Sequence, residues 1–508
     1  MALVLKPGGG IKRLTLESGE KVVLVYEPLG RGDYVISLGG ERSLVAADSQ
    51  QAIDLGPGVG KAEFEGLPLT KPLWHVPSRL KAEAWADGSL KVRTNAELYD
   101  RTRKYYAIFG DFAQAWHPDI LSLFVFQSYL KPLLGTLFQV PISGEFGSGK
   151  TAVLEALAAP AYHPIMAATC SPAARARLTQ GYEPTWFIDE ADKVKQDTEG
   201  DSYDYVLMRT GYRRNNLYIR WDSEAKGPDV SEPFAALAYS MSSSVEKALQ
   251  TRALGEVEVE ISDDSRIPVI NSLKEGYGYE LNEELLFWRL DFMERRFSKS
   301  EDSQEPVPDL TELIGLPIDE ARERLYDIQT RGMNQREKAI LKRLFGREAE
   351  LSFIALKVES LLGIDVIESL ARAVNVKRMA EASESDPRFT WLVNHLQVLT
   401  PLNQSSTLDS PGAKGPPKVR MNEVAQTLKE ECQKNSWKEP GGRSWSSWYH
   451  RLGIEKGVNY RRDVEGTYIL LTPAVRKAID RILNAQEIDV EALRELGTVK
   501  AAVPGSEG

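Results

Sequence analysis

Residues 144–151 read Gly144-Glu145-Phe146-Gly147-Ser148-Gly149-Lys150-Thr151, which fits the pattern G-x-x-x-x-G-K-[ST] at every fixed position. The three glycines let the backbone turn tightly and aim its N–H groups inward at anionic oxygens. The stretch therefore predicts a phosphate-binding loop in which all eight residues contact a nucleotide. Lys150 brings a mobile positive charge to the outer phosphates, and the Thr151 hydroxyl is a ligand for Mg²⁺. We expect ATP and Mg²⁺ to bind here.

The flanking sequence supports this interpretation. Residues 137–143 form an apolar run typical of a buried strand, and residues 151–158 are good helix formers. A strand followed by the loop and a helix is the context that the motif requires. The helix would add its positive amino-terminal end to the phosphate site.

A second acidic element follows at residues 185–190, where Thr-Trp-Phe-Ile leads into Asp189 and Glu190. An apolar run that ends in two acids predicts a buried parallel strand with carboxylates at its carboxyl end, the edge at which open α/β sheets bind ligands. We expect Asp189 to hold the Mg²⁺ shell and Glu190 to polarise the attacking water.

Two further side chains complete the set of catalytic candidates. Residues 234–240 predict another strand, and Ser240 at its end could sense the γ-phosphate; an ordinary serine-rich loop is the alternative. Arg252 precedes an alternating strand at 257–261 and could act as an arginine finger on a neighbouring subunit's ATP. The alternative for Arg252 is a plain surface arginine.

This order of motifs resembles the AAA+ class of P-loop ATPases. Within that class, residues 97–261 are similar to superfamily 3-like helicase ATPases of plasmids, viruses and integrated elements. The resemblance is carried by residues 144–151, 188–192, 211–214 and 251–252. Ser240 stands where the family more often has Asn or Thr. The resemblance implies a ring, expected to be a hexamer, because an arginine finger needs a neighbour's nucleotide.

The resemblance also implies a pore element before the sensor strand. In superfamily 3-like helicases the corresponding insertion lines the central pore, and here it contains Tyr212, Arg213 and Arg214. An aromatic face suits base stacking, and guanidinium groups suit phosphates. A solvated basic turn is the alternative.

Composition sets the class of protein. The chain has 508 residues, 42% of them hydrophobic, a net charge of −10 and two cysteines, so a disulfide framework or cysteine metal cluster is not expected. We expect no signal peptide and no membrane span, and hence a cytoplasmic protein. Charge is unevenly distributed: residues 411–481 contain 14 Lys and Arg but only 8 Asp and Glu. This concentration of basic residues indicates a local surface that binds nucleic acid.

That basic segment predicts a winged-helix domain, with helices at 421–434 and 444–452 and a strand at 467–471. Its candidate DNA contacts are Arg443, Ser444, Ser446, Ser447, His450 and Arg451 on the second helix, and Arg461 and Arg462 on the wing. We expect Trp445, Trp448 and Tyr449 to be core residues, with base stacking as the alternative. A winged helix used for protein contact is also open.

The sequence thus predicts a multidomain α/β protein: a small amino-terminal β domain, an AAA+ P-loop α/β core with a helical lid, and a carboxyl-terminal winged helix. The expected boundaries are 1–92 for the β domain, 93–265 for the ATPase core, 266–400 for the lid and further helices, 401–418 for a linker, 419–484 for the winged helix and 485–508 for a loose tail.

Three functions fit these features. The first is an ATP-dependent DNA helicase or translocase, acting on single-stranded or forked DNA in replication or mobile-element maintenance. The second is a DNA-bound ATPase switch, such as a loader, initiator or transposition regulator, that does not unwind DNA. The third is a DNA-binding regulator whose assembly is locked by nucleotide without turnover.

Overall fold

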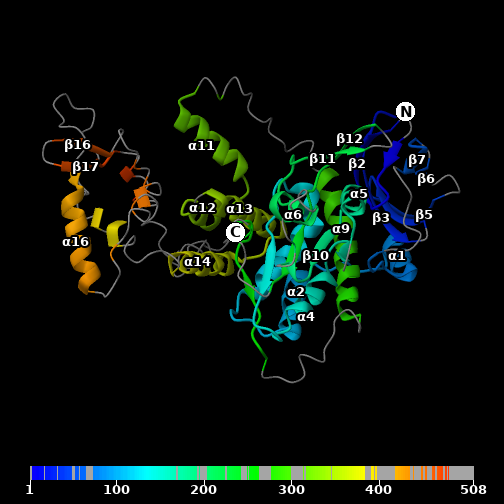
Figure 1. The fold of residues 1–508 in the computed structure, drawn as a ribbon. Helices are drawn as coiled ribbons and strands as arrows, with labels where there is room; N and C mark the ends of the chain where they lie inside the picture. Colours follow the sequence, from blue (N-terminus) through cyan, green and yellow to red (C-terminus); the bar gives the residue numbers. More distant parts are fainter. Residues whose placement is uncertain are drawn as a thin grey trace, which may run out of the picture. The chain divides into compact units, whose positions relative to one another are not determined.

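The computed structural model divides into two compact units, Met1–Ala373 with Val490–Gly508 and Val374–Asp489 (Figure 1). The structure describes residues 3–16, 18–30, 32–47, 52–56, 58–64, 73–167, 170–191, 194, 203–222, 226–241, 249, 251–262, 276–298, 313, 316–344, 346–383, 391–393, 395–396, 418–434, 439, 445, 448–449, 452, 454, 460–463, 466–472, 475–476, 479 and 493. No helix in these ranges is both long and apolar enough to cross a membrane.

The amino-terminal region contains two small sheets, one with strand order β1-β7-β6 and one with order β2-β3-β4-β5. The strands are β1 (Leu3–Leu5), β2 (Gly10–Thr15), β3 (Lys21–Gly30), β4 (Asp33–Leu38), β5 (Glu41–Ala46), β6 (Ala52–Asp54) and β7 (Lys61–Phe64). Between β6 and β7 the described residues form a turn, closed by a hydrogen bond from Leu55 N to Gly60 O (3.0 Å). The expected β domain also contains a helix, α1 (Arg79–Ala86), capped by Ser78.

The central feature is a five-stranded parallel sheet with order β14-β8-β13-β10-β9. Its strands are β8 (Val140–Ser143), β9 (Pro164–Met166), β10 (Thr185–Ile188), β13 (Leu237–Ser240) and β14 (Val257–Glu258). Strand β8 precedes the phosphate-loop motif and β10 precedes Asp189, while β13 lies between them. All side chains of β10 and β13 are buried, as expected for a parallel sheet covered on both faces.

Alternate side chains of the sheet meet different layers of helices. Trp186 and Ile188 pack with Leu207 and Met208 of α6 (Tyr203–Thr210) in one buried cluster. Phe187 points the other way and contacts Phe124 of α3, with ring centroids 6.2 Å apart. The remaining helices of this part are α2 (Asn95–Phe109), α3 (His117–Leu130), the short 3₁₀ helix η1 (Lys131–Leu133), α4 (Lys150–Ala158) and α5 (Pro172–Tyr182). The result is a three-layer αβα core.

A two-stranded ribbon, β11 (Tyr218–Asp222) and β12 (Gly227–Ser231), separates α6 from β13. Helices follow the sheet as expected, namely α9 (Tyr277–Ser298), α11 (Ile318–Gln329), α12 (Gln335–Leu341), α13 (Gly346–Leu362) and α14 (Ile367–Ser383). Helix α9 packs against both β3 and α3, so it joins the β domain to the αβα core.

The described residues of the second unit include a three-stranded antiparallel sheet with order β15-β17-β16 and the long helix α16. These elements are β15 (Lys418–Arg420), α16 (Met421–Lys434), β16 (Tyr460–Asp463) and β17 (Gly466–Leu470). The helix agrees with the predicted range 421–434. Trp448 is buried in the core of this unit and Trp445 and Tyr449 are packed against it, as expected for core residues. Leu392, Val393 and Leu396 belong to the same core, although they precede the expected linker.

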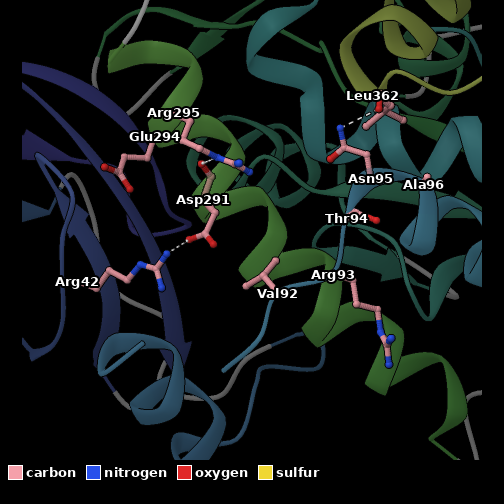
Figure 2. Close-up of a pocket in the computed structure, with 10 residues that line it drawn as sticks. All are labelled: Arg42, Val92, Arg93, Thr94, Asn95, Ala96, Asp291, Glu294, Arg295 and Leu362. Atoms are coloured by element: carbon pink, nitrogen blue, oxygen red, sulfur yellow. Dashed lines mark hydrogen bonds and ion pairs between the residues drawn. The ribbon is translucent and has the colours of Figure 1, made fainter. Parts of the chain in front are cut away.

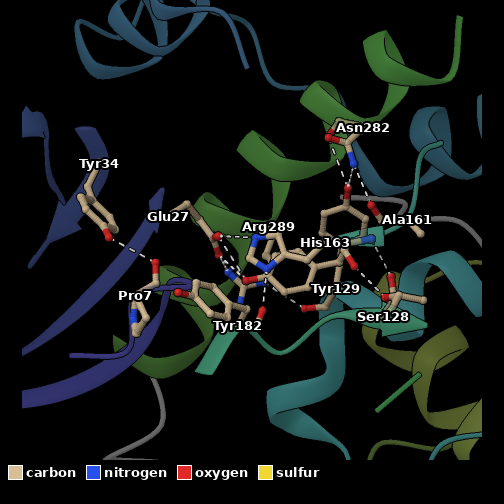
Figure 3. A network of polar contacts seen from close by, with 12 residues as sticks. Pro7, Glu27, Tyr34, Ser128, Tyr129, Ala161, His163, Tyr182, Asn282 and Arg289 are labelled. Carbon is tan, nitrogen blue, oxygen red and sulfur yellow. Dashed lines mark hydrogen bonds and ion pairs between the residues drawn. The ribbon is translucent and has the colours of Figure 1, made fainter. Parts of the chain in front are cut away.

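A buried ion pair joins the β domain to the αβα core (Figure 3). Glu27 of β3 and Arg289 of α9 form the pair, and both side chains are fully buried. The Tyr162 hydroxyl donates to Glu27 Oε1 (2.9 Å), and Arg289 Nε donates to the carbonyl of Tyr129 (3.1 Å). His163 Nε2 lies 3.3 Å from the same carboxylate. Burial makes each charge dependent on the other, because neither has water as a substitute partner.

We predict that Glu27→Gln lowers the free energy of unfolding by about 3–5 kcal/mol, because it leaves the Arg289 guanidinium buried without a counter-charge. Urea titration followed by tryptophan fluorescence measures this. The control is Glu83→Gln in the solvent-exposed Arg79–Glu83 pair, which we expect to change stability by less than about 0.5 kcal/mol. Equal small effects in both variants would show that the buried pair does not hold the junction.

Candidate active site

The loop from Gly144 to Thr151 has the backbone conformation that its glycines permit. Gly144, Gly147 and Gly149 all have positive φ, at 152°, 85° and 91°. A Cβ on Gly144 would lie 2.3 Å from the carbonyl oxygen of Val259 and 2.5 Å from Ser148 Oγ, so this position accepts only glycine without a shift of the backbone. The loop is therefore held tightly against the residue that follows β14.

Lys150 and the start of α4 form the cationic side of the loop. Lys150 Nζ donates to the carbonyl oxygens of Gly144 (2.8 Å) and Glu145 (2.7 Å), which fixes the ammonium beside the loop. Helix α4 begins at Lys150 after Gly149 and has no side-chain cap. Its first N–H groups are thus left for an external acceptor, and the helix dipole favours an anion there.

Asp189 joins three segments of the site. Its Oδ2 accepts a hydrogen bond from the Thr151 hydroxyl (3.1 Å), and its Oδ1 accepts from the Ser240 hydroxyl. The backbone N–H of Glu190 donates to both Asp189 Oδ1 (3.0 Å) and Ser240 Oγ (3.1 Å). The structure therefore brings together Thr151, Asp189, Glu190 and Ser240, which the sequence placed on separate elements.

Glu190 has an unusual backbone conformation. Its φ is 51°, in the left-handed region that residues with a side chain rarely adopt. The turn follows β10 directly, so two consecutive acids take different directions, and the Glu190 side chain is exposed. Such local strain costs on the order of 1–3 kcal/mol and is characteristic of functional sites.

A hydroxyl and one carboxylate are a suitable but incomplete ligand set for Mg²⁺. Thr151 and Asp189 provide hard oxygen donors, and the described part of the chain contains no group of three or more His, Cys, Asp or Glu side chains able to hold a metal alone. This fits the usual way in which Mg²⁺ binds, through one or two protein oxygens together with waters and substrate phosphates.

Arg252 lies away from this site. It precedes β14, and its neighbour Ala253 pairs with Gln139 before β8 begins, so Arg252 is at the amino edge of the sheet. The phosphate loop follows β8 and is at the opposite edge. Arg252 Nε donates to the carbonyl of Arg209 (2.7 Å). The chain's own loop is thus out of its reach, which leaves a role on a neighbour's nucleotide as a proposal.

The Tyr212–Arg214 turn differs from the expected pore loop. Tyr212 is only 6% exposed, and its ring lies beneath the guanidinium groups of Arg347 (4.6 Å) and Arg252 (5.5 Å). A buried ring cannot stack on bases, so the expectation for Tyr212 is corrected. Arg214 donates to the carbonyls of Leu134 and Lys131, whereas the Arg213 side chain is 56% exposed beside Glu350.

The exposed aromatic of this region is instead Trp221 on the β11–β12 ribbon, which the sequence analysis did not single out. Trp221 is 71% exposed and Ile219, on the same face of β11, is 60% exposed. The ribbon is held by the Arg220–Asp229 ion pair, so its apolar face is presented on an ordered support. In the sequence, the alternation of Ile219 and Trp221 with the polar Arg220 was the pattern from which this apolar face could have been predicted.

The candidate DNA contacts of the second unit are described only in part. Arg461 and Arg462 lie exposed on β16, which pairs with β17. The other candidates lie outside the described residues, namely Arg443, Ser444, Ser446, Ser447, His450 and Arg451.

A cavity of about 600 Å³ lies where the β domain, the start of α2 and α9 meet (Figure 2). Its three arginines are already engaged: Arg42 with Asp291 (2.8 Å), Arg93 with Glu284 (3.3 Å), and Arg295 with the carbonyl of Asp291 (3.1 Å). Thr94 caps α2 in a capping box, so the helix end is satisfied as well. This cavity is a structural junction with little unmet charge.

No family model matches the chain, and no curated protein matches it. Among solved structures, a JCV helicase is 12% identical over 51% of this chain and 66% of its own, with a TM-score of 0.24. The present chain thus spans slightly less than two thirds of that structure.

Two further structures match over longer stretches. SCCmec type IV Cch, an active helicase, is 10% identical over 93% of this chain and 94% of its own, with a TM-score of 0.30. The NrS-1 C-terminal region is 11% identical over 72% and 91%, with a TM-score of 0.26. At these identities and TM-scores, the likenesses support no conclusion about the activity of this chain.

We predict that Gly144→Ala weakens ATP binding roughly 5- to 100-fold, because the added Cβ forces a strain of about 1–3 kcal/mol into the loop. Titration with a fluorescent ATP analogue measures the affinity. Gly135→Ala is the control, since a Cβ there meets nothing within 4 Å. Unchanged affinity in Gly144→Ala would mean that the loop does not hold the phosphates in this conformation.

Proposed function

We propose that this chain is an ATP-hydrolysing AAA+ motor that acts on DNA as a helicase or translocase. The observation that carries the proposal is the convergence of Thr151, Glu190 and Ser240 on the Asp189 carboxylate, beside a glycine-rich loop that holds Lys150. A nucleoside triphosphate is the ligand for which this combination of anion cradle, cation and hard metal ligands is suited.

Each residue then has a distinct task. The N–H groups of residues 144–151 and the start of α4 bind the phosphates, and Lys150 offsets the charge of the outer ones. Thr151 and Asp189 hold Mg²⁺, which would supply further charge neutralisation when bound. Glu190 orients and polarises the attacking water, while Ser240 couples the γ-phosphate region to β13 through its bond to Asp189.

The proposal includes a ring of subunits, expected to be a hexamer. Arg252 lies at the sheet edge opposite its own phosphate loop, so it can assist hydrolysis only on another subunit's nucleotide. Its bond to the carbonyl of Arg209 on α6 ties it to the segment that leads into the β11–β12 ribbon. A change of the nucleotide bound to one subunit could thus alter the position of the β11–β12 ribbon of the neighbouring subunit.

We propose that Trp221 and Arg213 contact the bound DNA strand. Trp221 offers an exposed ring for base stacking, and Arg213 offers a half-exposed guanidinium for a phosphate. The second unit supports DNA binding by its three-stranded sheet, long helix and exposed Arg461 and Arg462, an arrangement compatible with a winged helix. A switch that hydrolyses ATP without unwinding is the alternative.

We predict that Glu190→Gln retains ATP binding and lowers ATP turnover at least ~100-fold, because the amide cannot polarise water as a carboxylate does. Steady-state hydrolysis and analogue binding are measured on the same preparation. Glu260→Gln serves as the control, since Glu260 is exposed just beyond β14. Substantial residual turnover in Glu190→Gln would remove Glu190 from the role given to it.

We also predict that Trp221→Ala lowers the affinity for single-stranded DNA by about 1–3 kcal/mol, the usual value of one aromatic–base stack, while basal ATP turnover is unchanged. Fluorescence anisotropy of a labelled oligonucleotide measures it. Leu80→Ala, which removes an equally exposed apolar side chain on α1, is the control. If Trp221→Ala instead changes the oligomeric state alone, the apolar face of the ribbon is a subunit contact.

A further inference from the structure

A second cavity, of about 380 Å³, lies at the amino edge of the central sheet. Glu183 and Phe234, which line it, precede the first residues of β10 and β13. The phosphate loop and Asp189 follow the last residues of β8 and β10, at the opposite edge. The cavity is therefore separate from the nucleotide site.

Lys131 is the unusual residue of this cavity. It is only 5% exposed, and its ammonium lies 5.6 Å from the centre of the Phe234 ring. None of the residues that the structure describes accepts a hydrogen bond from Lys131 Nζ or forms an ion pair with it. Glu183 and Glu232 act on the Lys131 ammonium only through their charge, without direct contact. A buried ammonium that no anion contacts directly is costly, and a bound anion would lower that cost.

The side chains that line the cavity around Lys131 carry more positive than negative charge. Six charged side chains line the cavity, of which four are basic, namely Lys6, Lys131, Arg177 and Arg214, and two are acidic, namely Glu183 and Glu232. Both acids are already engaged, since Glu183 accepts from Lys6 Nζ (2.8 Å) and Glu232 accepts from the backbone N–H of Asn215 (2.6 Å). The two remaining positive charges have no counterpart.

Electrostatic effects agree with this geometry. Burial lowers the pKa of the Lys131 ammonium, the charges of Lys6 and Arg214 act in the same direction, Glu183 and Glu232 oppose the shift, and the result is a pKa of about 8. Burial raises the pKa of the Glu183 carboxyl, but Lys131, Lys6 and Arg289 outweigh it and bring the pKa to about 2. Glu183 is thus an anion whose charge is shared by Lys6, which it contacts, and by Lys131, and the lining of the cavity keeps an excess of positive charge.

We infer that this cavity, which Lys131, Arg177 and Arg214 line, is a binding site for a phosphate group. A phosphate dianion matches the excess of two positive charges in the lining, and its oxygens accept several hydrogen bonds at once. Arg177 of α5 lines the cavity and is exposed, so an anion in solvent can reach it. The phosphate can be a free ion or a phosphate of single-stranded DNA.

The test is the melting temperature of the full chain with and without 10 mM inorganic phosphate at constant ionic strength. We expect phosphate to raise it by about 2 °C or more in the wild type. The rise should persist in Lys150→Ala, in which the nucleotide loop is impaired, and should be lost in Lys131→Met. A rise that persists in Lys131→Met and disappears in Lys150→Ala would overturn the inference, because the phosphate would then be in the nucleotide loop.

Two further variants keep the test independent of folding effects. Arg177→Ala alters only an exposed side chain and should reduce the phosphate effect, whereas Lys104→Met, at an exposed lysine of α2, should leave it intact. The phosphate effect of each variant is measured against the same variant without phosphate, so a change in its basal stability does not enter the comparison. An unchanged phosphate effect in Arg177→Ala and in Lys131→Met would contradict the assigned site.

The source of the phosphate follows from a second titration of the same variants. Labelled single-stranded oligonucleotides, with and without a 5′-phosphate, are compared with inorganic phosphate as competitor. If DNA supplies the phosphate, Lys131→Met lowers oligonucleotide affinity at least ~5-fold. If the ligand is free phosphate, oligonucleotide affinity stays unchanged while the thermal effect of phosphate is lost. Both results support the site, and neither depends on ATP turnover.

Discussion

The carboxylate of Asp189 accepts hydrogen bonds from Thr151, from Ser240 and from the N–H of Glu190, and these bonds join the phosphate loop to two strands of the sheet. They are possible because β13 lies between β8 and β10, and parallel strands end at a common edge. Any change in strand order would separate the cation, the metal ligands and the candidate base. The chemistry proposed for this chain therefore depends on one constraint of topology.

A second constraint governs what surrounds the site. The Glu27–Arg289 pair fixes the β domain on α9, and α9 in turn packs against α3 under the central sheet. Lys6 and the amino edge of the sheet are consequently neighbours, which creates the cationic cavity around Lys131. In both the Glu27–Arg289 pair and the cavity around Lys131, charged side chains are buried where the β domain meets the αβα core. A charge on one of these two parts is therefore balanced by a partner on the other.

Local patterns in the sequence were sufficient to predict much of the fold and to propose the nucleotide site. Apolar runs ending in Ser143 and Ile188 predicted two strands, and the glycine pattern predicted the loop, because these signals lie within a few residues. Contacts between distant residues were not accessible in this way. The burial of Tyr212 beneath Arg347, and the packing of Leu396 with the carboxyl-terminal core, depend on tertiary structure alone.

The most direct test of the central claim is ATP hydrolysis by the full chain with no DNA, with single-stranded DNA and with forked DNA, beside Lys150→Ala. The account predicts turnover that DNA stimulates several-fold and that Lys150→Ala abolishes. Turnover indifferent to DNA would contradict a DNA motor and favour a partner-driven switch. Turnover that survives in Lys150→Ala would contradict the nucleotide site itself.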